Sequence, residues 1–419
     1  MRAYDPLHDC KLVGAVRAIC GVRDSVVIVH ARPGCHSGVL LLRTLSSKHN
    51  EAKIVFSGLR DKDMAFGGEG RVATAIKAAW EKLEPKLIAV LNCSAPAIMG
   101  DDVEGVAAVM KREVPAEILT LSAGGYEGPD WIGYEEALRE LVRFMSPPSR
   151  KDKEKVNLIG FKDDEPGAAA DLSEIKRMLK AHEIGINAVL SCCSFEELRR
   201  APEASLNVVL GGDGLRCAEE MEEKFGLPYV ITPYPFGFDN TMRFLEAICE
   251  KLGKKINEEF VREERKRVKE GIERIYFHLQ GIYDLPVAVI GESSRAFDLA
   301  KFLREELGFD VKILVVSSRN HLTSEKEREE GMYFGELLVE PDKFEMDRKV
   351  KSSEIELIFG STVERKLARE LDVPLVRFSF PVVDEVSISD NPYAGFKGVL
   401  ALVEKIVNSI ITRYEKIEI

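Results

Sequence analysis

The sequence has no Cys-x-x-Cys pair, although it contains eight cysteines, at positions 10, 20, 35, 93, 192, 193, 217 and 249. Compact zinc fingers and ferredoxin inserts need such close pairs, so both are excluded. Any metal site must therefore be assembled from cysteines that are distant along the chain. In a reducing cytoplasm, an even number of cysteines favours metal or redox chemistry over disulfides.

The chain also lacks a membrane-spanning run, a signal peptide and an excess of basic residues. No apolar run approaches the ~18 residues of a membrane span, and the first ten residues have no apolar core. The formal net charge of -11 argues against nucleic-acid binding, which needs clustered Lys and Arg. We therefore expect a cytoplasmic protein that binds neither membranes nor nucleic acids, and whose charge suits a basic-faced protein partner.

Short apolar runs alternate with amphipathic helical stretches along all 419 residues. This alternation is typical of parallel α/β sheets. We expect an α/β protein with three Rossmann-like domains, at residues 1–150, 151–275 and 276–419. Residues 146–155 predict a linker, a charged connecting helix is expected near 254–280, and a closing helix near 394–414. Strands are expected at 25–30, 53–56, 87–91 and 117–121, then at 156–160, 185–190, 206–210 and 229–232, and last at 286–291, 311–316, 354–359 and 375–378.

Two cysteines directly follow predicted strands of the first domain. The strand at 25–30 runs into the loop that carries Cys35, and the strand at 87–91 runs into Cys93. Ligands of open parallel sheets bind beyond the carboxyl ends of the strands, and Cys10 precedes the helix that leads into the first of these strands. The three thiols can therefore converge at one sheet edge, where soft thiolates suit an iron–sulfur cluster. The alternative is that they are buried core cysteines, a common environment for this residue.

Several other features keep two interpretations open. His30 and His36 flank the cysteine loop, as proton donors or as hydrogen-bonded loop histidines. The glycine-rich stretch 211–214 precedes a helix, where it either binds an anion or makes a tight turn. The remaining cysteines are expected to serve packing, although Cys192 and Cys193 follow a strand and can instead face a central cleft; the packing cysteines on predicted helices are Cys20 and Cys249.

Three segments resemble the nitrogenase component 1 family, the α and β subunits of the molybdenum–iron protein. The first begins at Cys10-Lys-Leu-Val-Gly and reaches Cys35 after 25 residues. The second is Ala65-Phe-Gly-Gly at the start of a helix, and the third runs from Asn92-Cys93 to Gly100-Asp-Asp. Weaker similarity at 206–228 and 359–398 extends the resemblance over nearly the whole chain.

The resemblance implies an oxidoreductase in which Cys10, Cys35 and Cys93 match the family's cluster ligands. In that family three cysteines from each of two subunits hold a cluster at the interface. A homodimer, or a heterodimer with a sister subunit, is therefore expected, with a [4Fe–4S] cluster or a larger P-cluster-like one. Electrons are expected from an ATP-hydrolysing iron protein, and this chain itself has no Walker A pattern.

One departure from the family's pattern narrows the range of expected substrates. In the α subunit, a cysteine at the end of a Leu-Asn-hydrophobic strand anchors the molybdenum cofactor. Here the corresponding strand, 206–210, ends without a cysteine, and Cys217 lies within the following helix. A tetrapyrrole or another large organic substrate in the cleft between the three domains is therefore expected rather than dinitrogen. The alternatives are a scaffold that matures a metal–sulfur cofactor and a non-catalytic protein that binds a metal chelate.

Overall fold

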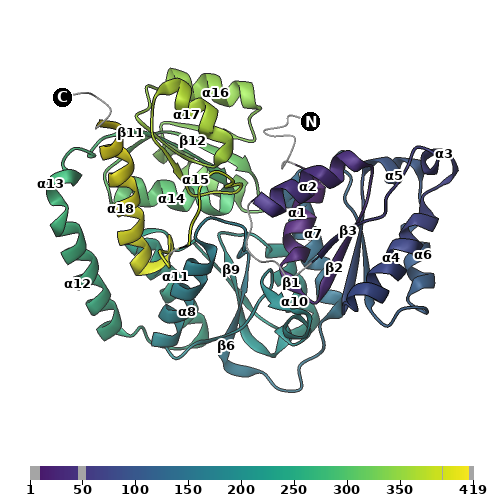
Figure 1. Cartoon of the computed structure of the whole chain (residues 1–419). Coiled ribbons are helices and arrows are strands. Elements are labelled where there is room, and N and C mark those ends of the chain that lie inside the picture. Colours follow the sequence, from purple (N-terminus) through teal and green to yellow (C-terminus); the bar gives the residue numbers. More distant parts are fainter. Residues whose placement is uncertain (1–9, 46–52, 389, 415–419) are drawn as a thin grey trace.

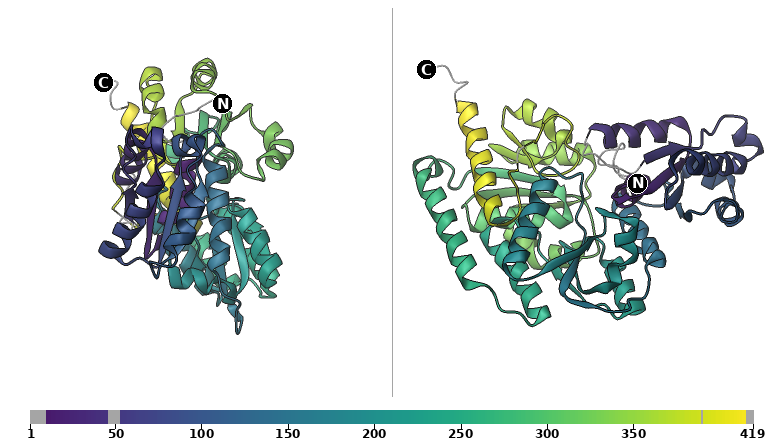
Figure 2. Two further views of the ribbon diagram at one scale, coloured as in Figure 1. Left: turned by 90° about the vertical axis from the view of Figure 1, so that its right-hand side faces the viewer. Right: turned by 60° about the horizontal axis from the view of Figure 1, so that its bottom comes forward.

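Three parallel β-sheets with helices on their faces make up most of the molecule (Figure 1). The computed structural model describes residues 10–45, 53–388 and 390–414 of the chain. The first sheet and its helices lie to one side of the other two sheets, an arrangement also visible after rotation (Figure 2). The expected α/β architecture with parallel sheets is confirmed.

The first sheet has the order β3-β2-β4-β5, and all of its strands are parallel. Alternate residues of β2 point to opposite faces, so that Val27 and Val29 join one core cluster while Val26 and Ile28 join another. Every residue of β2 is buried, as expected for a central strand covered on both sides. The four strands are β2 (Ser25–His30), β3 (Lys53–Phe56), β4 (Leu87–Asn92) and β5 (Glu117–Ser122).

The second and third sheets have the orders β10-β9-β6-β7 and β13-β12-β11-β14-β15. They share one hydrophobic core, because the same cluster contains Val156 and Leu206 of the second sheet and Val287 and Leu357 of the third. Their strands are β6 (Asp152–Ile159), β7 (Gly185–Val189), β9 (Ala204–Leu210), β10 (Tyr229–Thr232), β11 (Pro286–Glu292), β12 (Asp310–Ser318), β13 (Glu336–Val339), β14 (Leu357–Gly360) and β15 (Leu375–Arg377).

Helices connect successive strands, and none within the described ranges is long and apolar enough to cross a membrane. Those of the first part are α1 (Lys11–Cys20), α2 (Pro33–Leu45), α3 (Asp63–Phe66), α4 (Glu69–Leu83), α5 (Ser94–Met99), α6 (Val103–Met110) and α7 (Asp130–Leu141). The second part contains α8 (Ala168–Ala181), α9 (Phe195–Arg199), α10 (Leu215–Phe225), α11 (Gly237–Leu252) and α12 (Glu258–Arg274). The third contains α13 (Tyr276–Leu279), α14 (Ser293–Glu305), α15 (Thr323–Glu330), α16 (Lys343–Ser352), α17 (Arg365–Leu371) and α18 (Gly395–Tyr414).

Two of the contacts between the parts are made by backbone pairing and by the closing helix. A short ladder pairs β1 (Val22–Arg23) with β8 (Cys193–Ser194), so the first part is hydrogen-bonded to the second. The closing helix α18 packs against α8, α11 and α12 of the second part. Each main sheet takes its strands from one of the spans 1–150, 151–275 and 276–419, but these domain boundaries stay a prediction because the second and third spans share a core.

Some expected boundaries were wrong. The predicted linker at 146–155 overlaps β6, which begins at Asp152. The charged residues at the end of this stretch form the solvent-exposed first part of the strand. The strand predicted at 354–359 begins only at Leu357, after Glu354 has adopted a positive φ of 49°. The half-buried edge strand β13 was not predicted, since its short run lacks a clear burial pattern. The charged helix near 254–280 and the closing helix are confirmed as α12 and α18.

Helices α1 and α7 cross at unusually close range because each has a glycine at the crossing. A Cβ added at Gly14 of α1 would lie 1.7 Å from the carbonyl oxygen of Asp130. A Cβ added at Gly133 of α7 would lie 1.9 Å from the carbonyl oxygen of Lys11. Both neighbouring atoms belong to the backbone, so a side chain at either position must move a helix. The crossing therefore fixes the start of α1, and with it Cys10.

We predict that Gly14→Ala destabilises the protein by about 1–3 kcal/mol or more, because the added methyl group overpacks the crossing. The midpoint of urea unfolding measures the effect. Gly70→Ala is the matched control, since Gly70 lies in helix α4 with nothing within 4 Å of an added Cβ. There the greater helix propensity of alanine should stabilise by up to about 1 kcal/mol. Equal midpoints for the two variants would contradict the close crossing.

Candidate functional site

The three cysteines singled out in the sequence all lie at the starts of helices. Cys10 directly precedes α1, Cys93 directly precedes α5, and Cys35 lies in the first turn of α2. The backbone N–H groups at the start of a helix carry a partial positive charge, which favours a thiolate. The helix starts thus favour a thiolate at all three positions, although other effects raise the pKa of Cys10 and of Cys93.

The register of the first sheet brings Cys35 and Cys93 together. Strands β2 and β4 are paired so that His30 lies opposite Asn92, and both chain segments leave the sheet at the same edge. The backbone N–H of Cys93 then donates to the carbonyl oxygen of His30 over 3.0 Å. A hydrogen bond from the thiol of Cys93 lowers the pKa of Cys35 to about 6 and raises the pKa of Cys93. Cys35 is thus the thiol of this pair that ionises first.

Cys10 lies near the same two cysteines, at the start of α1. Its Cβ lies 3.5 Å from where a Cβ added at Gly125, in the segment after β5, would stand. Burial raises the pKa of Cys10, while backbone N–H groups of Val13 and Leu12 favour its thiolate. The charge of Cys35 acts on Cys10, and Cys93 lies within the influence of both. The structure therefore brings the three predicted residues together.

These three thiols fit an iron–sulfur cluster better than a single ion. In the described part of the chain, no three His, Cys, Asp or Glu side chains lie close enough to hold one metal ion. A cluster needs no such convergence on one atom, because each thiolate binds a different iron. The donors are soft sulfur atoms, as iron–sulfur clusters require. Cys35 is exposed, whereas Cys93 is only 2% exposed.

His30 is a hydrogen-bonded residue beneath this site, as the more conservative of the two interpretations predicted. It is fully buried at the end of β2, with Nε2 2.9 Å from Oδ2 of Asp101 and Nδ1 2.8 Å from Oγ of Ser57. The side chain of His36 lies outside the described part of the structure. Sequence reasoning missed Asp101 and Ser57 as partners, because both are distant from His30 in the sequence and only Ser57 directly follows a predicted strand.

The other cysteines lie away from this group. Cys20 and Cys249 are buried among apolar side chains, which confirms their packing role. Cys193 is buried in the β8 ladder, and Cys192 packs at the edge of the core shared by the second and third sheets. Cys217 is buried on α10, with its sulfur 4.0 Å from Sδ of Met221.

A cluster of buried charges lies where the three parts meet. The guanidinium of Arg17 on α1 pairs with Asp164 at 2.8 Å, with Glu165 at 3.0 Å and with Glu292 at the end of β11. Lys162 pairs with Glu292 as well, and all five side chains are at most a tenth exposed. This cluster lies near the carboxyl ends of β6 and β11 and ties the three parts together. The predicted substrate cleft between the three domains stays a prediction.

The glycine-rich stretch 211–214 binds an anion that belongs to the protein itself. The carboxylate of Glu135 on α7 accepts the N–H of Gly214 at 2.6 Å and the N–H of Arg216 at 3.3 Å. The start of α10 is thus occupied by a side chain of the first part. Burial raises the pKa of Glu135 to about 7, and the nearby carboxylate of Asp213 adds to this effect.

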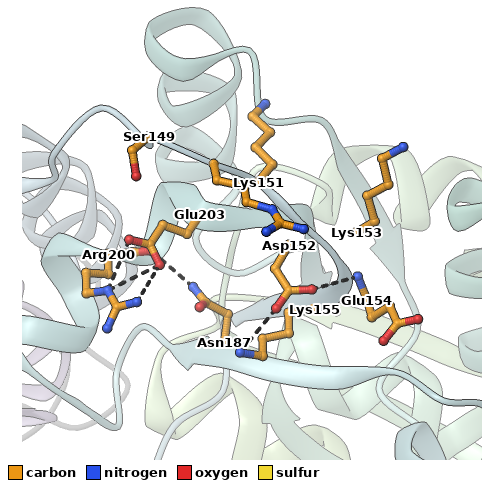
Figure 3. A pocket seen from close by; sticks show the side chains of 10 residues that line it. Ser149, Lys151, Asp152, Lys153, Glu154, Lys155, Asn187, Arg200 and Glu203 are labelled. Atoms are coloured by element: carbon orange, nitrogen blue, oxygen red, sulfur yellow. Dashed lines mark hydrogen bonds and ion pairs between the residues drawn. The ribbon is translucent and has the colours of Figure 1, made fainter.

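A polar groove of about 690 Å³ lies at the other end of the second sheet (Figure 3). Its walls include Asp152 and Lys155 at the beginning of β6, and Arg200 and Glu203 just before β9. These are the amino ends of the strands, whereas ligands of parallel sheets bind at the carboxyl ends. Two of its carboxylates are already paired, Asp152 with Lys155 and Glu203 with Arg200. We therefore do not assign the chemistry to this groove.

Large apolar side chains are exposed beside the cysteines. Phe66 on α3 is 90% exposed and Ile98 on α5 is 74% exposed, and these two helices contact one another. Leu40 on α2, the helix of Cys35, is 47% exposed. Exposed apolar groups that lie together mark contact surfaces for other proteins.

The sequence matches one family of known proteins over most of its length. The family described as nitrogenase component 1 type oxidoreductase matches residues 10–411. The chain is 26% identical over 447 residues to the nitrogenase iron-iron protein beta chain of Rhodobacter capsulatus, covering 98% of this chain and 94% of that one. It is also 26% identical over 375 residues to the nitrogenase iron-molybdenum cofactor biosynthesis protein NifE of Clostridium pasteurianum, covering 87% of this chain and 80% of the relative.

A further relative is one of the subunits of the light-independent protochlorophyllide reductase from Prosthecochloris aestuarii. It is 26% identical over 428 residues, which cover 97% of this chain and 79% of the relative. The solved structure of nitrogenase Cp1 at pH 6.5 superposes with a TM-score of 0.85 at 24% identity, covering 99% of this chain and 94% of that chain. This structural similarity confirms the shared fold.

We predict that the free energy of unfolding falls as the pH rises from 5 to 8. Burial raises the pKa of Glu135, Glu165 and Glu306 from the ordinary 4.5 to about 7. Their stabilising contribution is complete below pH 4.5 and is lost as the pH rises through 7, by roughly 1–3 kcal/mol for each fully buried carboxyl. Burial lowers the pKa of His321, so this one group opposes the trend.

Denaturant unfolding at several pH values measures this slope. Glu306→Gln should flatten it, because glutamine cannot lose a proton. The exposed Glu250→Gln is the control and should leave the slope unchanged. A slope that is the same in Glu306→Gln as in the control would show that Glu306 is ionised in the folded protein at pH 5.

Proposed function

Because this chain belongs to the nitrogenase component 1 type oxidoreductases, we propose that it is the cluster-bearing subunit of a nitrogenase-like reductase. The observation that carries the proposal is the meeting of Cys10, Cys35 and Cys93 at one edge of the first sheet. An iron–sulfur cluster bound there supplies acceptance and release of single electrons.

The three cysteines would hold one side of the cluster, and a second subunit would hold the other. Three thiolates cannot complete the four ligands of a [4Fe–4S] cube, and a larger P-cluster-like group needs more. The exposed thiol of Cys35 supports an interface at this surface. The second subunit is another copy of the chain or a sister subunit. Burial of Cys93 keeps water from that side of the site.

The electron donor in this proposal is an ATP-hydrolysing iron protein. The sequence has no Walker A pattern, so ATP hydrolysis falls to a partner. The exposed apolar surface of Phe66 and Ile98 lies on helices next to the cysteines and offers a docking site. The net charge of -11 favours a partner with a basic face.

The substrate in this proposal is a large organic molecule such as a tetrapyrrole. It would bind in the cleft between the three domains of this chain. The relative named as part of a protochlorophyllide reductase supports a tetrapyrrole. Within this site, the chain's own residues would hold the cluster and exclude water.

A scaffold for assembly of a nitrogenase-type metal–sulfur cofactor is the second candidate. Its support is the similarity to the cofactor biosynthesis protein NifE, which at 26% identity is as high as the similarity to the protochlorophyllide reductase chain. Repeated turnover with an iron protein, ATP and a tetrapyrrole would favour the reductase. Transfer of a metal–sulfur cofactor to an apo-enzyme, without turnover, would favour the scaffold.

We predict that Cys10→Ala, Cys35→Ala and Cys93→Ala each lose most of the iron that the wild-type protein binds after anaerobic reconstitution with iron and sulfide. A cluster held by few thiolates does not tolerate the loss of one. Iron and acid-labile sulfide per chain measure the result. Cys249→Ala, which removes a buried thiol far from the site, is the control and should keep its iron. Iron retained in all three site variants would refute the ligand assignment.

A further inference from the structure

We propose that Asp101 is a positioning residue, which fixes the turn that carries Cys93 to the strand that leads to Cys35 and to the loop that follows Phe66. The proposal rests on the proposed function in one respect, namely that Cys35 and Cys93 are cluster ligands. We call the four residues that make these connections, His30, Ser57, Gly68 and Asp101, the Asp101 clasp.

Both carboxylate oxygens of Asp101 are engaged. Oδ2 accepts a hydrogen bond from Nε2 of His30 at 2.9 Å, and Oδ1 accepts the backbone N–H of Gly68 at 3.1 Å. Nδ1 of His30 lies 2.8 Å from Oγ of Ser57, and the neutral imidazole protonated at Nε2 satisfies both contacts. The side chains of the clasp are buried, so these groups have no access to water as a substitute partner.

The clasp joins four segments that are remote in the sequence. His30 ends β2, Ser57 follows β3, Gly68 precedes α4, and Asp101 follows α5. The approach of Gly68 is so close that a Cβ there would lie 2.5 Å from Oδ2 of Asp101 and 2.9 Å from Cε1 of His30. The glycine is therefore what allows the loop to reach the carboxylate.

Backbone hydrogen bonds extend the clasp to the cysteines. The N–H of Cys93 donates to the carbonyl oxygen of His30 at 3.0 Å. The N–H of Asp101 donates to the carbonyl oxygen of Pro96 at 3.1 Å, which closes the turn that begins at Cys93. The position of Cys93 is thus set from both ends by residues of the clasp.

The same clasp reaches the exposed surface on its other side. Phe66 lies two residues before Gly68, and Ile98 lies in α5 between Cys93 and Asp101. If Phe66 or Ile98 is displaced, the movement therefore acts on residues of the clasp, which are hydrogen-bonded to the segments that carry the cysteines. The docking surface and the thiols are held as one unit through Asp101.

The test measures how fast iodoacetamide alkylates each cysteine of the full-length, reduced, metal-free protein, by mass spectrometry. In Asp101→Ala, two buried donors lose their acceptor, and the turn of Cys93 opens more often. We expect Cys93, which is 2% exposed, to react about tenfold faster than in the wild-type protein. Asp101→Asn keeps one acceptor and should restore most of the protection.

Asp102→Ala is the matched control. Asp102 is the next residue, and its carboxylate instead caps α6 by accepting the N–H of Gly105 at 2.8 Å. Loss of that cap should leave the rate at Cys93 within about twofold of wild type. Cys217, fully buried on α10, serves as an internal control and should keep its rate in every variant.

Equal rates at Cys93 in Asp101→Ala and Asp102→Ala would overturn the proposal, and so would a parallel acceleration of Cys217. If Asp101→Ala does not fold, Ser57→Ala removes only the hydroxyl at Nδ1 of His30 and should accelerate Cys93 in the same direction. No acceleration in Ser57→Ala would then overturn it. Because no metal is needed, protection by Asp101 in a protein that never binds iron would contradict the proposed function alone.

Discussion

The parallel pairing of β2 with β4 is the constraint on which the candidate site depends. Since His30 lies opposite Asn92, the two chain segments leave the sheet side by side, and the thiols of Cys35 and Cys93 share a hydrogen bond. The third thiol depends on a different contact, the glycine crossing of α1 and α7, which holds Cys10 against the same edge. A shift in the register of β2 and β4, or at the crossing of α1 and α7, would separate these thiols, which lie up to 83 residues apart in the sequence.

The buried charges around Arg17 give the chain its second organising feature. One guanidinium pairs with carboxylates from the second and third sheets, so the helix that begins after Cys10 is tied to all three parts. Breaking one partner of such a buried pair is costly, because the remaining charge has no water around it. The cluster lies near the carboxyl ends of β6 and β11, where it holds the three parts together.

Much of the first sheet and of the candidate site could be predicted from the sequence, because buried parallel strands appear in it as short apolar runs. The strands of the first sheet and the convergence of Cys35 and Cys93 follow from those runs and from the rule on strand ends. The buried charge cluster around Arg17 could not be predicted, since Arg17 and Glu292 are 275 residues apart and pair only in the fold. The hydrogen-bond partners of His30, Ser57 and Asp101, could not be predicted for the same reason. The half-exposed β13 lacked the periodic pattern by which strands are recognised.

The most direct test of the account is to locate iron by anomalous X-ray scattering in anaerobically grown crystals of the reconstituted protein. The account predicts one multi-iron peak between two chains, with the sulfur atoms of Cys10, Cys35 and Cys93 of this chain bonded to it. Iron at the central junction, or a complete cluster held within one chain, would contradict the account.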